Sequence, residues 1–256
     1  MSSMNAISAQ GIQKKFGAVT AAADVQMTIA HGERVSLIGS NGAGKTTFVN
    51  MLTGYIKPDA GEIMLDGQSI IGMPPRQIAR MGVARSFQIP QLYHSLTVQN
   101  NLLAALAAQQ STLSFLQPAK NADSVARAAE ILQRFDLSMH ADRLVSELPG
   151  GVRKLLDIAM ALTSQPNVLL LDEPTSGVSA DEKFPMMDTV MRALEGSRTT
   201  VLFVEHDMDI VLRYSQRVIA FYSGRIIADD QPSQALAMPD VKRYVTGEMS
   251  ADTDHA

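Results

Sequence analysis

Hydrophobic residues along the chain form patterns that predict strands in both terminal regions and helices between them. Residues 6–12 and 23–29 alternate loosely between apolar and polar positions, which is typical of strands with one buried face. Residues 168–171 and 200–204 are continuous apolar runs, as in parallel strands that are buried on both faces, and residues 35–38 form a further apolar run. We therefore expect an α/β fold that contains both kinds of strand.

Turn residues mark the shorter elements. Gly54 can end a predicted helix at residues 45–52, and Pro75 after Pro74 favours the start of another short helix. The remaining expected strands are residues 61–67, 83–87, 218–222 and 225–228, the last two joined by a hairpin turn at Ser223 and Gly224.

The middle of the chain has a helical pattern. From about residue 97 to 162, apolar residues recur at helical spacing. They include Leu102, Leu103 and Leu106 in one segment, and Val125, Ala129, Leu132 and Phe135 in another. We interpret this stretch as a separate lobe with a surface connection at 111–123, and we expect the polar end of the chain, 250–256, to be disordered.

Composition excludes several classes of protein. The chain has 256 residues, is 46% hydrophobic and contains no cysteine, which predicts a sizeable core without disulfides or thiol chemistry. A net charge of −4 argues mildly against nucleic acid as a partner. Residues 1–5 have no signal-peptide pattern, and no run of about 18 apolar residues occurs. We expect a protein that is neither secreted by that route nor membrane-spanning.

A glycine-rich loop between residues 35–38 and the helix at 45–52 predicts a phosphate cradle. Glycine lets the backbone turn so that successive N–H groups point at phosphates, and Lys45 can reach the β/γ oxygens. Thr46 offers a hydroxyl for Mg²⁺ beside the positive helix N-terminus. The alternative is an ordinary glycine turn beside a solvated lysine. The predicted loop comprises Gly39, Ser40, Asn41, Gly42, Ala43, Gly44, Lys45, Thr46 and Thr47.

Two further polar groups follow buried strands, where a parallel sheet presents ligands. Asp172 can bind Mg²⁺ through water, and Glu173 can polarise the water that attacks the γ-phosphorus. A structural turn is the alternative for this pair. His206 can hydrogen-bond a γ-phosphate as a neutral imidazole, or it can cap the next helix beside Asp207.

These residues resemble the ATP-binding cassette (ABC) family from about residue 6 to 247. In that family's terms, 39–47 is similar to the Walker A loop, 168–172 to Walker B, Glu173 to the catalytic glutamate and His206 to the switch histidine. Gln88 resembles the Q-loop glutamine that senses Mg²⁺ and the attacking water, although a plain polar role is the alternative. Phe16 resembles the aromatic that stacks on adenine, with a core position as its alternative.

Two motifs depart from the family pattern. The signature loop, which in the family binds the γ-phosphate of ATP held by the opposite subunit, is here Leu148-Pro149-Gly150-Gly151-Val152. Pro149 removes a serine hydroxyl and a backbone N–H, whereas Gly150 and Gly151 keep theirs. Ser179 stands where the family's D-loop usually has Asp or Asn. Both differences weaken the expected contacts across the dimer.

The resemblance implies a P-loop NTPase core, with a mixed sheet and an antiparallel N-terminal subdomain, at 1–87 and 163–249. An α-helical subdomain is inserted at 88–162. Residues 15–17, 157–162, 224–228 and 239–241 resemble branched-chain amino-acid and urea/amide importers more narrowly.

That subfamily implies ATP and Mg²⁺ as cofactors and a cytoplasmic position, peripheral on the inner face of the membrane. Its partners are a second ATPase subunit, transmembrane permease subunits and, indirectly, a periplasmic solute-binding protein. The expected function is ATP hydrolysis that powers solute uptake. The alternatives are a weakly hydrolysing regulatory cassette and a non-transport ATPase of the same fold that acts on DNA or ribosomes.

Overall fold

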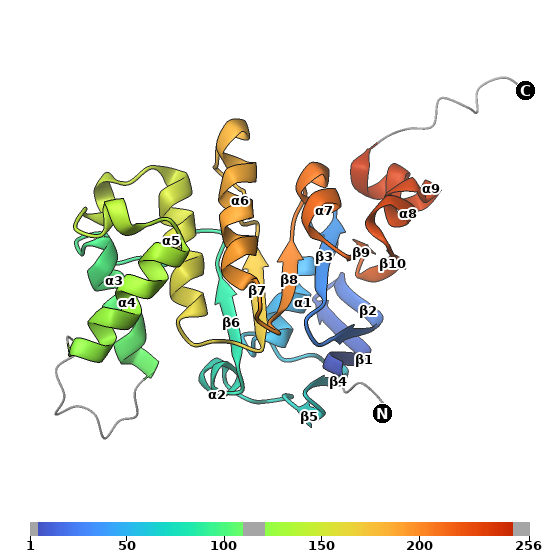
Figure 1. Ribbon diagram of the computed structural model, residues 1–256. Helices are drawn as coiled ribbons and strands as arrows, with labels where there is room; N and C mark the ends of the chain where they lie inside the picture. The colour runs from blue at the N-terminus through green and yellow to red at the C-terminus, as the bar shows by residue number, and fades with distance from the viewer. Residues whose placement is uncertain (1–4, 110–120, 248–256) are drawn as a thin grey trace, which may run out of the picture. The chain divides into compact units, whose positions relative to one another are not determined.

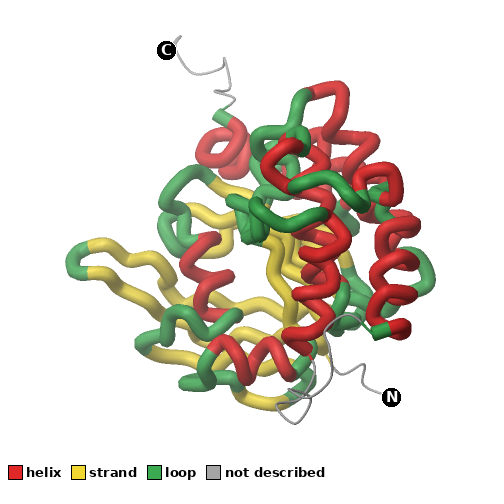
Figure 2. The backbone as a smooth tube through the Cα atoms, turned by 90° about the vertical axis from the view of Figure 1, so that its left-hand side faces the viewer, coloured by secondary structure: helices red, strands yellow, loops and turns green. Residues whose placement is uncertain are grey.

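The structure is a computed structural model that describes residues 5–109 and 121–247 (Figure 1). These residues pack into two units, which we describe one at a time. Unit 1 comprises the described parts of Met1–Val83 and Thr200–Ala256, and unit 2 those of Ala84–Thr199. The predicted tail at 250–256 and most of the predicted connection at 111–123 lie outside the described residues. The described residues include both helices and strands (Figure 2).

Unit 1 contains an antiparallel sheet with the strand order β2-β1-β4-β5. Its strands are β1 (Asn5–Phe16), β2 (Val19–Ala30), β4 (Ala60–Leu65) and β5 (Gln68–Ser69). β1 and β2 run well beyond the predicted 6–12 and 23–29, because their hairpin stays paired up to Phe16 opposite Val19. The apolar pattern in the sequence marks only the buried part of this hairpin, since its tip is exposed.

Parallel strands form the second part of unit 1. β3 (Arg34–Gly39) lies between β8 (Thr200–Val204) and β9 (Arg217–Tyr222) and is parallel to both (Figure 1). β10 (Arg225–Asp230) pairs antiparallel with β9, and the predicted turn residues Ser223 and Gly224 have φ of 48° and 75°. β8 is buried along its whole length, so the prediction of a strand covered on both faces is confirmed.

The helices of unit 1 include the two that were predicted from turn residues. α1 covers Lys45–Leu52, and α2 (Pro75–Arg80) begins with Pro75 in its first turn. The C-terminal helices pack a cluster of small and branched residues against β9 and β10. These helices are α7 (Met208–Tyr214), α8 (Pro232–Ala237), α9 (Pro239–Val241) and the π-helical turn η4 (Lys242–Thr246).

Unit 2 is largely helical. It contains α3 (Val98–Gln109), α4 (Ala122–Arg134), α5 (Gly150–Leu162), α6 (Ala180–Leu194) and the short helices η2 (Ser138–His140) and η3 (Val145–Glu147). Its strands are β7 (Val168–Asp172) and β6 (Val83–Ser86), which starts at the boundary of the units. α3 contacts α4 and α5, and α5 also contacts α6 and β7. The predicted lobe at 88–162 therefore lies within unit 2, which extends further to Thr199.

The buried face of α4 differs from the predicted one. Ser124, Ala128 and Leu132 form its buried line, while Ala129 is exposed, so the assignment of Ala129 to the core face was wrong. Two overlapping sets of residues satisfy helical spacing here, and the packing of α4 against α3, α6 and η2 decides between them. Within the residues described, no helix is long and apolar enough to cross a membrane.

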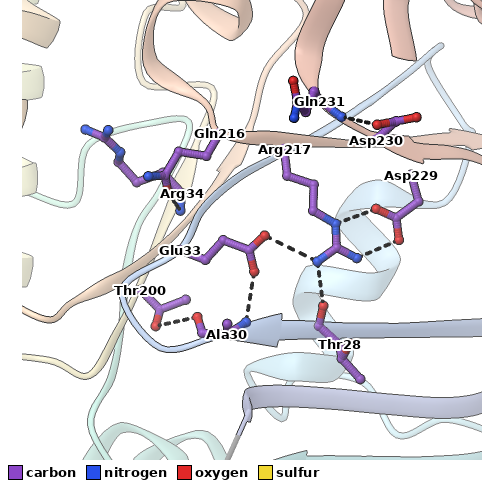
Figure 3. Close-up of polar contacts among 10 residues, drawn as sticks. All are labelled: Thr28, Ala30, Glu33, Arg34, Thr200, Gln216, Arg217, Asp229, Asp230 and Gln231. Atoms are coloured by element: carbon purple, nitrogen blue, oxygen red, sulfur yellow. Dashed lines mark hydrogen bonds and ion pairs between the residues drawn. The ribbon is translucent and has the colours of Figure 1, made fainter. Parts of the chain in front are cut away.

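Arg217 joins the two sheets of unit 1 (Figure 3). From β9 its guanidinium donates to both carboxylate oxygens of Asp229 at 2.5 and 2.7 Å, to Glu33 Oε1 at 3.3 Å and to the carbonyl of Thr28 at 3.0 Å. Hydrogen bonding to Asp229 raises the pKa of Arg217 above its usual value despite partial burial, and the charges of Asp229 and Glu33 raise it further. One planar cation thus links β2, the turn before β3, and β10.

Replacing Arg217 tests this link. Arg217→Met should lower the free energy of unfolding by about 1–2 kcal/mol, because two carboxylates and a carbonyl lose a charged donor in a site that solvent partly screens. Urea unfolding gives the value. Arg225→Met, which removes an exposed arginine from the same hairpin, is the matched control and should change stability little. Equal stability of the two variants would contradict the role of Arg217.

Candidate functional site

The phosphate loop leaves no room for side chains at two of its glycines. Gly39 and Gly44 have φ of 152° and 111°, and a Cβ at either position would lie 2.4 Å from the carbonyl oxygen of Phe221 or 2.3 Å from that of Ala21. Gly42 has open space around it but a φ of 78°. Close packing against neighbouring strands therefore requires glycine at positions 39 and 44, and the backbone conformation favours it at position 42.

Lys45 lies inside the loop. Its Nζ donates to the carbonyl oxygens of Gly39 at 2.6 Å and Ser40 at 3.1 Å, and the residue is only 8% exposed. The alternative of a solvated lysine is therefore wrong. α1 begins at Lys45, and no side chain caps its first turn, which leaves amide donors at the positive end of the helix dipole for an anion. A cradle of this shape fits a polyphosphate.

The remaining loop residues lie around this cradle. Ser40, Asn41 and Gly42 are exposed at its rim, and Ala43 is buried with its N–H donated to the carbonyl of Ser40 at 3.1 Å. Thr46 is exposed in the first turn of α1, and Thr47 is half-buried beside it. A hydroxyl at Thr46 is thus accessible at the same helix end as the cradle.

Phe16 lies at the tip of the β1–β2 hairpin. Its side chain is 48% exposed, and the ammonium of Lys14 stands 5.4 Å from its ring centroid. A core role for Phe16 is therefore wrong. An exposed ring at a hairpin tip can stack on a flat ligand, and the assignment of that ligand as adenine stays a prediction.

His206 follows β8 and is exposed. The helix α7 is capped instead by Asp207, whose Oδ1 accepts from the N–H groups of Asp209 at 3.0 Å and Ile210 at 3.4 Å. The fully buried Glu205 accepts from the N–H groups of His206 and Asp207 at 3.2 and 3.4 Å. The proposal that His206 is the helix cap is therefore wrong, and Glu205 is a structural residue that sequence reasoning missed.

In unit 2, Asp172 ends β7 and is paired with Arg85 of β6. The guanidinium lies 2.5 Å from Asp172 Oδ2, both side chains are about nine-tenths buried, and Arg85 also stands 4.7 Å from the ring centroid of Phe87. Sequence reasoning missed Arg85. The available signal was a cation within a predicted strand, which needs a buried acidic partner.

Glu173 and Gln88 meet in the same unit. Gln88 Nε2 donates to Glu173 Oε2 at 2.7 Å. The Q-loop role of Gln88 stays a prediction, beside the alternative of a plain polar residue. Glu173 has a φ of 46°, a conformation that is uncommon for residues other than glycine. Unit 2 thus places a carboxylate and an amide together at the end of a buried strand.

Two of the predicted Mg²⁺ ligands carry oxygen atoms of the kind that this ion prefers. Thr46 in unit 1 has an exposed hydroxyl and Asp172 in unit 2 a buried carboxylate, and their joint role as metal ligands stays a prediction. The described residues contain no group of three or more His, Cys, Asp or Glu that could hold a metal by itself.

The signature-like loop precedes α5. Leu148 is buried, and Pro149 is the N-cap residue with φ of −56° and no side-chain hydrogen bond to the helix. Gly150 and Gly151 form the first turn, and a Cβ at Gly150 would lie 3.4 Å from the carbonyl of Gly177. Ser179 donates to Glu182 Oε2 at 2.8 Å, within its own helix start. The amides of Gly150 and Gly151 are the donors that this loop retains.

Comparison with known proteins identifies relatives along nearly the whole chain. The family model described as ABC transporter matches residues 22–176. The high-affinity branched-chain amino acid transport ATP-binding protein LivG of Escherichia coli (strain K12) is 39% identical and covers 94% of this chain and 98% of its own. The corresponding protein BraF of Pseudomonas aeruginosa is 35% identical, with 93% and 96% covered.

Solved structures agree with these relatives. A nucleotide-free ATP-binding cassette from an ABC transporter superposes with a TM-score of 0.82 at 31% identity, covering 93% of this chain and 97% of that one. An ATP-binding cassette in its ADP conformation gives a TM-score of 0.81 at 31% identity, with 94% and 98% covered. The predicted combination of an antiparallel sheet with a parallel-rich sheet in a P-loop cassette is thereby confirmed.

The position of Lys45 leads to a prediction about affinity. Lys45→Ala should raise the Kd for ATP at least about tenfold, because a charged hydrogen bond to phosphate is worth about 1.5–3 kcal/mol. Equilibrium titration with a fluorescent ATP analogue measures it. Lys57→Ala removes an exposed lysine of unit 1 and is the control. A change below about threefold in Lys45→Ala would show that the cradle is misassigned.

The contact between Gln88 and Glu173 leads to a second prediction. In Glu173→Gln the new amide oxygen can still accept from Gln88 but cannot take a proton from water, so ATP turnover should fall roughly 10²-fold or more. ATP binding should persist and trap a closed dimer. Steady-state turnover and size-exclusion chromatography with ATP and Mg²⁺ test both effects. Glu195→Gln, at an exposed site after α6, is the control, and undiminished turnover in Glu173→Gln would exclude the assigned role.

Proposed function

The chain belongs to the ABC transporter family of ATPases, and we propose that it powers the import of branched-chain amino acids or similar small amides and acids. The observation that carries this proposal is the 39% identity to an Escherichia coli branched-chain amino acid transport ATP-binding protein over 98% of that protein. The same likeness favours transport over a DNA- or ribosome-directed ATPase. Retention of the phosphate cradle and of Glu173 favours hydrolysis over a purely regulatory cassette.

Unit 1 would bind and sense the nucleotide. Lys45 brings a positive charge to the β- and γ-phosphates, and the N–H groups of the loop neutralise the remaining oxygens. Phe16 would stack on adenine, and His206 would hydrogen-bond the γ-phosphate from the end of β8. A side chain at Gly39 or Gly44 would collide with a neighbouring carbonyl oxygen, so the loop needs glycine at both positions.

Unit 2 would supply the groups that act on water. Glu173 would accept the proton of the attacking water, and Gln88 would hold that carboxylate in place through the hydrogen bond between them. Thr46 and Asp172 would hold Mg²⁺ through oxygen ligands, and the ion when bound neutralises charge that develops on the phosphates. Arg85 balances the charge of Asp172 within β6 and β7.

Coupling to transport requires partners. A second ATPase subunit would place its ATP against Leu148, Pro149, Gly150 and Gly151, and hydrolysis would reopen the dimer. The difference in ATP affinity between closed and open dimers is what can move permease subunits, since a ligand shifts an equilibrium only by that difference. The permease subunits would hold the chain at the inner, cytoplasmic face of the membrane, and a periplasmic binding protein would deliver the solute.

Reconstitution tests this function. The chain is co-expressed with the candidate permease, second ATPase and binding protein sought among the neighbouring genes, and the complex is placed in liposomes with internal ATP. Uptake of labelled leucine should depend on the binding protein and should stop in a Glu173→Gln complex. Uptake of labelled urea is measured separately, as the alternative substrate. ATPase activity that responds to DNA or ribosomes and not to the permease would overturn the proposal.

A further inference from the structure

One carboxylate of α5 holds both ends of the segment that carries Gln88. Ser86 Oγ donates to Asp157 Oδ2 at 2.6 Å, and the N–H of Gln91 donates to Asp157 Oδ1 at 2.9 Å. Ser86 and Asp157 are 1% and 6% exposed, so water competes little for these bonds. The segment 86–91 is therefore bound to α5 before Gln88 and after it.

An ammonium one turn earlier on α5 holds the middle of the same segment. Lys154 Nζ donates to the carbonyl oxygens of Phe87 at 3.0 Å and Gln88 at 2.6 Å. Lys154 is only 2% exposed. Residues three apart on a helix lie on one face, so Lys154 and Asp157 act on the segment from the same side of α5.

The electrostatics of this arrangement depend on its hydrogen bonds. Burial raises the pKa of Asp157, while the hydrogen bonds from Ser86 and from the N–H of Gln91, together with the charge of Lys154, act in the opposite direction. Burying two charged groups is costly, and only well-formed bonds offset that cost. A hydrophobic pair could attach a loop to a helix without this cost, but it would not fix the orientation of the backbone carbonyls at Phe87 and Gln88.

That orientation matters because Gln88 also contacts Glu173. Its backbone carbonyl is held by Lys154, while its side chain donates to Glu173 Oε2 at 2.7 Å. α5 itself begins at Gly150, in the signature-like loop. Hydrogen bonds of Lys154 and Asp157 therefore connect α5 to the segment of Gln88, and the Gln88 side chain connects that segment to Glu173.

We propose that Lys154 and Asp157 are positioning residues that fix Gln88 against Glu173 and couple the signature end of α5 to the hydrolytic carboxylate. This inference rests on the proposed ATPase function. It states that α5, which begins in the signature-like loop, acts through Lys154 and Asp157 on Glu173 of the same subunit. Neither side chain touches the nucleotide in this proposal, so their loss should affect turnover and leave ATP binding intact.

Spin labels test the tether without any activity. Because the chain has no cysteine, Ile89→Cys and Arg153→Cys supply two labelling sites, one in the segment and one on α5. Electron paramagnetic resonance on the full nucleotide-free chain should give a narrow distance distribution. The distribution should become at least about twice as broad with Lys154→Met or with Asp157→Ala, and should stay narrow with Lys154→Arg, which keeps the donors.

Kinetics test the consequence in the reconstituted complex. Lys154→Met should lower kcat about tenfold or more, because small displacements of catalytic groups are costly, while the Kd for ATP should stay within about twofold. Lys154→Arg should restore most of kcat. Arg134→Met and Glu130→Gln, which remove exposed charges from α4 of the same unit, are the controls and should leave both quantities unchanged.

The outcomes separate this inference from the proposed function. An unchanged kcat or an unchanged distance distribution in Lys154→Met would overturn the positioning role, whatever the complex transports. Equal losses of kcat and ATP affinity would also overturn it in favour of a general structural role. If Lys154→Met fails to fold, Ser86→Ala is the second variant. It removes one hydrogen-bond donor to Asp157 and should lower kcat without weakening ATP binding. An inactive unmodified complex would instead count against the proposed function. The distances between the spin labels would still test whether Lys154 and Asp157 hold segment 86–91 against α5.

Discussion

The close approach of the phosphate loop to its neighbouring strands is the constraint on which the nucleotide site depends. Gly39 packs against the backbone of Phe221 in β9, and Gly44 packs against that of Ala21 in β2. A single methyl group at either position would collide with a carbonyl oxygen, so the loop and both sheets of unit 1 must be placed together. Lys45 then fills the turn from inside and brings a cation to the place where phosphates would bind.

Unit 2 organises its chemistry with buried charges. Arg85 faces Asp172, and Lys154 and Asp157 bind a single backbone segment from one helix face. Each such group would be strongly unfavourable alone, because the protein interior solvates charge poorly. Their partners therefore have little freedom to move independently, and this rigidity suits a site in which Gln88 and Glu173 must keep a defined geometry.

Comparison of prediction with structure shows where local patterns are reliable. The strand at 200–204 and the helix at 45–52 were predicted with the observed bounds, because a continuous apolar run and a glycine-bounded helix are local signals. Ala129 was assigned to the wrong side of α4, and His206 was considered as a cap that Asp207 in fact provides. Both errors concern the direction of a side chain, which neighbouring elements decide.

The sequence by itself determined the phosphate loop, the acidic residues after the 168–171 strand and the family resemblance, because these motifs are contiguous and their backbone needs are local. Only the tertiary structure decided which groups from distant segments meet. Arg85 lies 87 positions before Asp172, and Ser86 lies 71 positions before Asp157. No local propensity encodes such pairs, because they form only when separate elements pack together. Packing excludes water, and each buried polar or charged group then depends on its partner for hydrogen bonds.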